Sequence, residues 1–113
     1  MKDVNTISLT ELTKMAENMY GNLVKAVVDI QKDKLVVNAE MHADIEQYLL
    51  EHDSEQNDLW GINIYPEKYG GEAFIEFDSM INIRPRQQNM SRGVDNPDIR
   101  TKIINLVLAK VTS

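Results

Sequence analysis

Residues 23–39 read LVKAVVDIQKDKLVVNA, two apolar runs rich in valine on either side of a short polar link. From Val24 to Ile30 every second residue is apolar, the period of a strand that packs one face on a core. The second run, Leu35 to Ala39, is also rich in β-branched residues, so the two runs predict a hairpin although the link holds no glycine. This hairpin indicates an antiparallel sheet.

Helical periodicity flanks the hairpin on both sides. Before it, apolar residues recur at helical spacing over residues 9–20, Ser8 and Glu11 have the spacing of a capping box, and Gly21 is placed to end the helix. After it, a second apolar stripe predicts a helix over residues 40–52, which a wholly polar loop follows.

The second half of the chain predicts three more strands and one more helix. Alternation and strand-forming composition predict strands over residues 60–65, 73–77 and 80–84. A loop over residues 85–95 leads to Asn96-Pro97-Asp98, which supplies an N-cap, a first-turn proline and a first-turn acid for a third helix. The predicted order is α-β-β-α-β-β-β-α, an α+β fold with a mostly antiparallel sheet and helices mainly on one face.

Length and composition limit the class of protein. The 113 residues, 42% apolar and 27% charged, predict a single globular domain over residues 1–113. The absence of cysteine excludes disulfides, thiolate zinc sites and cysteine nucleophiles. No apolar leader and no apolar run of membrane-spanning length is present, so we expect a cytoplasmic protein without membrane contact.

Charge is divided unevenly along the chain. Residues 1–83 carry sixteen Asp and Glu against six Lys, a net charge of −10, whereas residues 84–113 carry four Arg and two Lys against two Asp, a net charge of +4. Such an asymmetry marks either an anion-binding patch or internal pairing between the two parts of the chain. Both interpretations stay open at this point.

An Ile-Asn-Ile sequence occurs twice, each time closely followed by proline. Period-two alternation sends Asn63 and Tyr65 to one face of the first strand, and it sends Asn82 and Arg84 to one face of the second. Two interpretations remain open: the asparagines lie on a solvated face or bind a neighbouring backbone group, or the four side chains form a platform for a ligand.

The run from Arg84 to Arg92 carries hydrogen-bond donors at nearly every position, Arg86 and Asn89 among them. Guanidinium groups suit phosphate or carboxylate oxygens, and the helix that follows directs its N-terminal N–H groups back at this loop. An anionic small molecule or a nucleic acid is therefore one candidate partner. Pairing with carboxylates of the same protein, or of a second subunit, is the alternative.

Two residues are weak candidates for catalysis. His42 shares a helix face with Glu46, but two side chains do not make a metal site, and we predict neither a metal nor a cofactor. Asp78 follows a predicted strand and is a candidate general base, although Asp-Ser is also ordinary turn chemistry.

The strand faces that the helices are not expected to cover carry several apolar residues. A homodimer would remove this surface from water. The residues concerned are Leu23, Val27, Val36, Ile75, Phe77 and Met80.

Four segments resemble a family of short bacterial and archaeal proteins catalogued as a domain of unknown function: residues 23–29, residues 42–44, the DLWGINIYP of residues 58–66 and the IEFDSMINIRP of residues 75–85. The resemblance spans most of the chain and implies a free-standing cytosolic domain. It implies no activity, substrate or catalytic residue.

The sequence thus favours a non-catalytic binding or assembly module that presents polar side chains to an anionic ligand or partner. The alternative is a small hydrolase or nuclease in which His42 or Asp78 acts as base and arginines stabilise a phosphoryl transition state. The predicted ligand-binding residues are Asn63, Tyr65, Asn82, Arg84, Arg86, Asn89 and Arg92.

Overall fold

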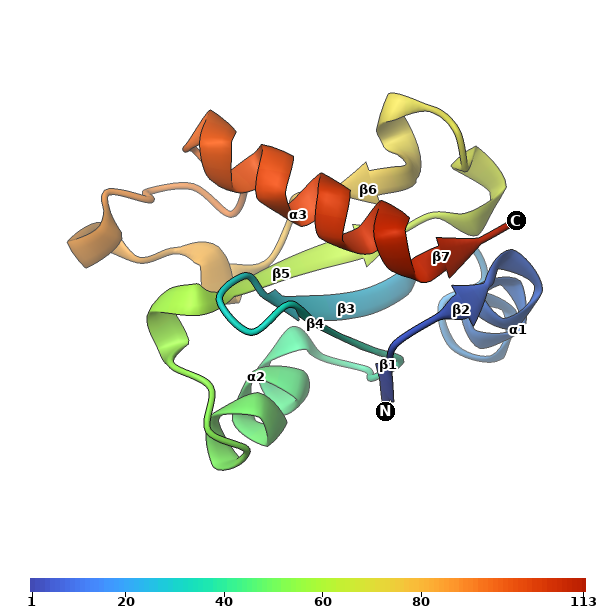
Figure 1. Ribbon diagram of the computed structural model, residues 1–113, viewed down its shortest axis with the longest axis horizontal. Helices are drawn as coiled ribbons and strands as arrows, with labels where there is room; N and C mark the ends of the chain where they lie inside the picture. Colours follow the sequence, from blue (N-terminus) through green and yellow to red (C-terminus); the bar gives the residue numbers. More distant parts are fainter.

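A five-stranded antiparallel sheet forms the centre of the computed structural model, which describes all 113 residues (Figure 1). The predicted hairpin is confirmed, because β3 and β4 pair from Ala26–Val37 to Asp29–Lys34. In spatial order the strands are β1 (Lys2–Val4), β4 (Lys34–Val37), β3 (Val24–Asp29), β5 (Leu59–Ile64) and β6 (Ile75–Glu76).

The three predicted helices are present, and they cover both faces of the sheet. Helices α1 (Leu9–Met19) and α3 (Pro97–Lys110) pack on the face that carries Val24, Ala26 and Val28. Helix α2 (His42–Glu51) packs on the opposite face, where Ile45 and Leu49 bury Val27 and Val36. The α+β class is confirmed, with two helices on one face and the third on the other. No helix combines the length and the apolar character needed to cross a bilayer.

Two of the helices begin at the residues that the sequence indicated. Ser8 accepts a hydrogen bond from the Glu11 N–H at 3.1 Å, and Asn96 accepts from the Asp98 N–H at 2.8 Å. Helix α2 differs, because its N-cap residue Met41 offers no side-chain acceptor and no side chain caps its first turn. The Asp44 N–H bonds to the Met41 carbonyl at 3.2 Å, and the N–H groups of His42 and Ala43 are left without a cap.

Short pairings at the chain ends were not predicted. β1 adds an edge strand to the sheet beside β4. β2 (Ile7–Ser8) and β7 (Val111–Thr112) form a separate parallel pair that joins the two ends of the chain. Two- and three-residue strands are too short to carry a readable alternation, so only the tertiary structure reveals them.

The strand predicted over residues 80–84 is wrong, and the strand predicted over 73–77 is reduced to two residues. Residues Met80–Asn82 form a 3-10 turn, which Ser79 caps by accepting from the Ile81 N–H at 3.3 Å. The sheet edge beside Gly61 is therefore completed by the side chain of Asn82 instead of a strand. The common outer face expected for the two Ile-Asn-Ile sequences does not exist.

Several residues of the predicted homodimer surface are buried inside the protein. Val27 and Val36 are fully buried beneath α2, and Ile75 is 7% exposed. The predicted dimer interface therefore loses those residues to the protein's own core. The homodimer itself stays a prediction.

Candidate functional site

A cavity of about 270 Å³ lies at the N-terminal end of α2, and we call it the α2 pocket. Four segments far apart in the sequence meet there: the end of α1, strand β3, the start of α2 and the loops around the Met80–Asn82 turn. The lining residues are Tyr20, Lys25, Glu40, Met41, His42, Ala43, Ser79, Met80, Ile81 and Arg92.

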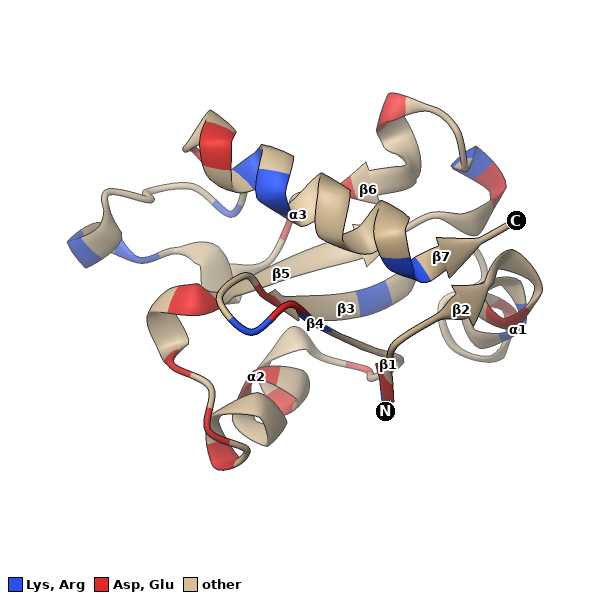
Figure 2. Cartoon of the chain, in the orientation of Figure 1, with Lys and Arg blue, Asp and Glu red and all other residues tan.

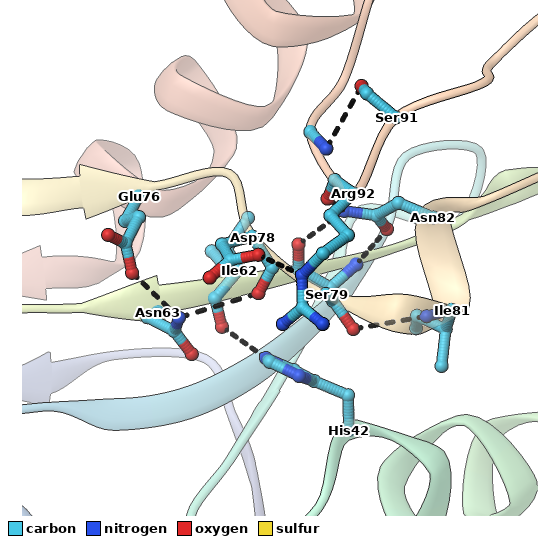
Figure 3. Close-up of polar contacts among 12 residues, drawn as sticks. His42, Ile62, Asn63, Glu76, Asp78, Ser79, Ile81, Asn82, Ser91 and Arg92 are labelled. Carbon is cyan, nitrogen blue, oxygen red and sulfur yellow. Dashed lines mark hydrogen bonds and ion pairs between the residues drawn. The ribbon is translucent and has the colours of Figure 1, made fainter.

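Arg92 is held in place by its side chain and by its backbone. Its Nε donates to Asp78 Oδ1 at 2.5 Å, and its carbonyl accepts from the Ser79 N–H and the Asn82 amide, both at 2.9 Å. The terminal Nη atoms of Arg92 have no protein partner, and Figure 3 shows them beside the His42 ring. Asp78 therefore orients a guanidinium whose remaining donors face the pocket.

His42 forms the inner wall of the α2 pocket. The residue is 6% exposed, and its Nε2 lies 2.7 Å from the Ile62 carbonyl oxygen (Figure 3). Burial lowers the pKa of His42 below its ordinary 6.5 and outweighs the bond to the Ile62 carbonyl, which raises it. Lys25 and Arg92 lower this pKa further, and Asp78 opposes them. A neutral ring that donates from Nε2 to a carbonyl leaves Nδ1 as an acceptor, and Nδ1 has no protein partner.

Lys25 and the first turn of α2 add positive potential to the pocket. Lys25 forms no ion pair, and its Nζ lies 5.1 Å from the centre of the Tyr20 ring. The uncapped N-terminus of α2 contributes the N–H groups of His42 and Ala43 and the positive end of the helix dipole. Glu40 is the one acidic side chain in the lining.

A chain of hydrogen bonds lies behind Asp78. Asn63 Nδ2 donates to Glu76 Oε1 at 2.9 Å and to the Asp78 carbonyl at 3.4 Å, and the Tyr65 hydroxyl donates to Glu76 Oε1 at 3.1 Å. Burial raises the pKa of Tyr65, and its bond to Glu76 adds to that shift. Asn63 is 4% exposed, and its Oδ1 has no partner. Two predicted ligand-binding residues thus support the segment that carries Asp78.

The other two predicted asparagines bind backbone groups. Asn82 is fully buried and bonds to Gly61 and to the Arg92 carbonyl. Asn89, 3% exposed, donates to the carbonyls of Asn82, Ser91 and Gly93 and accepts from the Asp95 N–H. These side-chain amides supply backbone hydrogen bonds in the long loop before α3, where no strand or α-helix does so.

The predicted arginines separate into three different environments. Arg84 lies 4.2 Å from the centre of the Trp60 ring and donates to the carbonyls of Gln56 and Leu59, away from the α2 pocket. Burial lowers its pKa. Arg86 is exposed and makes no hydrogen bond or ion pair. Arg92 alone of the seven predicted ligand-binding residues lines the pocket.

The structure brings the two catalytic candidates next to Arg92. Asp78 pairs with it directly, and His42 lines the same cavity. No group of three or more His, Asp or Glu side chains is placed to hold a metal ion. Sequence reasoning missed Lys25 as a site residue. The available signal was a lysine on the strand face that α2 otherwise buries.

A larger cavity of about 320 Å³ lies between α3 and the segment around β6. Its lining is mostly apolar, including Phe74, Phe77, Ile104 and Leu108, and Glu72 is its one charged residue. It holds no histidine, serine, lysine or arginine. Polar chemistry is therefore concentrated in the smaller α2 pocket.

Residues 4–110 match the model of a family described as Protein of unknown function (DUF5674). The chain belongs to this family. The DUF5674 match confirms the resemblance seen in the sequence. The family description assigns no activity, so a function has to be inferred from the geometry of the site. No curated protein and no solved structure matches the chain.

Proposed function

We propose that this domain binds a small anionic ligand in the α2 pocket, through Arg92, Lys25 and the first turn of α2. The observation that carries the proposal is the orientation of Arg92. Asp78 occupies its Nε, two further donors hold its carbonyl, and its terminal amines are left beside His42. An exposed pair such as Arg92–Asp78 contributes little to stability, and its main effect here is to aim the guanidinium.

The charge distribution favours a small anion over a nucleic acid. Figure 2 shows acidic residues along α2, whose start forms the pocket, and along the loop that follows α2. A long polyanion lying across this region would meet those carboxylates, whereas a small anion enters the cavity alone. The volume of about 270 Å³ suits a small ligand.

Titration with inorganic phosphate, followed by NMR at low ionic strength, tests the proposal. We expect saturable shifts at His42 and Ala43 that weaken with added salt. Arg92→Gln removes the aimed donors and should lower the affinity about tenfold or more, since hydrogen bonds to charged groups are the strong ones.

Arg86→Gln is the matched control, because Arg86 lies in the same loop without contacts. It should change the affinity by less than about twofold. Equal effects of the two substitutions would show that binding follows net charge and not the pocket. Absence of any phosphate-dependent shift would remove the proposal.

Hydrolysis of a phosphate ester is a second candidate function, which the position of His42 favours. His42 lines the same cavity as Arg92, its Nδ1 has no protein partner, and a neutral histidine is available as a base near pH 7. Release of nitrophenolate from p-nitrophenyl phosphate, abolished in His42→Asn, would support hydrolysis. Unchanged release in that variant would count against His42.

The homodimer remains a separate prediction. Light scattering coupled to size-exclusion chromatography at high protein concentration measures it directly. A mass of twice 12.9 kDa is expected, and a monomer mass would contradict it.

A further inference from the structure

The mouth of the α2 pocket carries exposed apolar side chains from three elements. Met41 at the start of α2 is 60% exposed, Met80 in the Met80–Asn82 turn is 64% exposed, and Tyr20 at the end of α1 is 44% exposed. The half-buried Lys25 and the exposed Arg92 line the same cavity. Cationic donors and an apolar rim therefore belong to one pocket.

We infer that the ligand of the α2 pocket is a phosphate monoester attached to a flat ring, of the kind that a nucleoside monophosphate represents. This inference rests on the proposed function and specifies the ligand of the same site. The phosphate accepts hydrogen bonds from Arg92, Lys25 and the first turn of α2, and the ring lies against the apolar rim.

The donor arrangement fits a phosphate better than a carboxylate. Lys25 reaches the site from the sheet, Arg92 from the loop above it and the N–H groups of His42 and Ala43 from α2. A tetrahedral group with three acceptor oxygens meets donors from three directions, whereas a planar carboxylate does not.

A helix N-terminus is not by itself a site, and here a second observation points to a ligand. The side chain of His42 is more than nine-tenths buried, it lines the cavity, and its Nδ1 has no partner in the protein. Nδ1 itself is not closed off by the protein, so a ligand in the cavity can reach it. Nδ1 accepts from a hydroxyl, and so does the carboxylate of Glu40 at the pocket mouth, which suits the hydroxyl groups of a ribose.

The rim is built for an aromatic face. Methionine sulfur and methyl groups contact aromatic rings favourably, and their flexible side chains adjust to the shape of the ring. A tyrosine ring adds a surface for offset stacking. With Lys25 near the Tyr20 ring, the apolar rim and the phosphate donors are contiguous.

Four probes test the inference by calorimetry or NMR: adenosine monophosphate, adenosine, glycerol 3-phosphate and inorganic phosphate. We expect adenosine monophosphate to bind at least about tenfold tighter than the two phosphates without a ring, and adenosine to bind weakest. If phosphate binds but adenosine monophosphate binds no tighter than glycerol 3-phosphate, the ring is not recognised and the inference fails while the proposed function stands. If no phosphate compound binds, both fail.

Rim variants separate ring recognition from phosphate binding. Met80→Ala should weaken adenosine monophosphate about threefold to tenfold and leave inorganic phosphate unchanged. Met90→Ala is the matched control, since Met90 is 69% exposed and lies outside the pocket. Both positions are exposed, so folding is preserved in each variant. Equal affinities of the two variants for adenosine monophosphate would overturn the assignment of the rim.

Discussion

The side-chain amide of Asn82 pairs with both backbone groups of Gly61, accepting from its N–H at 2.8 Å and donating to its C=O at 2.9 Å. This is the bonding that a neighbouring strand would supply, and it comes from a residue in a 3-10 turn. Because the same amide also donates to the Arg92 carbonyl, the edge of β5 and the guanidinium of the α2 pocket are positioned by one side chain.

Asn82→Ala should destabilise the protein by about 2–4 kcal/mol, because two buried backbone groups of Gly61 lose their partner. Urea unfolding measures the change. Asn105→Ala, at an exposed position of α3, is the control and should stay within about 0.5 kcal/mol of the wild type. A small effect at Asn82 would show that water replaces the amide.

Gly61 leaves room for Ser79, and a Cβ at this position would lie 2.6 Å from Ser79 Cβ and Oγ. Gly61→Ala should therefore cost about 1–3 kcal/mol, and adding Ser79→Gly should recover part of that loss. Gly71→Ala, where the nearest atom would be Lys68 O at 3.5 Å, should be close to neutral. Additive effects of Gly61→Ala and Ser79→Gly would contradict the steric explanation.

His42 should make the stability of the fold depend on pH. Its pKa in the folded protein lies below 6.5, so as pH falls below that value the unfolded chain takes up a proton that the folded chain still excludes. The free energy of unfolding should therefore drop more steeply as pH falls through about 6.5 in the wild type than in His42→Gln.

Arg84 and Arg92 should separate stability from binding. Arg84→Met removes the bonds to Gln56 and Leu59, and we expect a loss of about 1–3 kcal/mol with phosphate affinity within about twofold of the wild type. Arg92→Gln should lower the phosphate affinity and leave the free energy of unfolding close to that of the wild type. Urea unfolding and phosphate titration on both variants measure the two effects. Loss of phosphate binding in Arg84→Met would show that the loop acts as one unit.

Local patterns predicted much of this fold. The caps at Ser8 and Asn96, the three helices, the β3–β4 hairpin and strand β5 all follow from residues close together in the chain. The same local reasoning fails after Asp78, where Met80–Asn82 has the alternation of a strand and forms a 3-10 turn. That outcome depends on a partner about twenty residues away, at Gly61, and no local pattern contains it.

The candidate site divides in the same way. Its residue types were visible in the sequence: guanidinium groups in the loop before α3, a histidine at the start of a helix and an aspartate after a strand. Which of them meet was decided by tertiary structure, since Lys25, His42 and Arg92 come from separate elements.

By itself, the sequence determined the period of each helix and of the long strands, because burial of one face requires apolar residues at a fixed local spacing. The tertiary structure decided how the polar side chains are used. Arg84 was directed to backbone carbonyls and Arg92 to a cavity, although both lie in the same loop. The physical reason is that a hydrogen-bond donor binds the acceptor that folding brings within about 3 Å, and distant segments supply most such acceptors here.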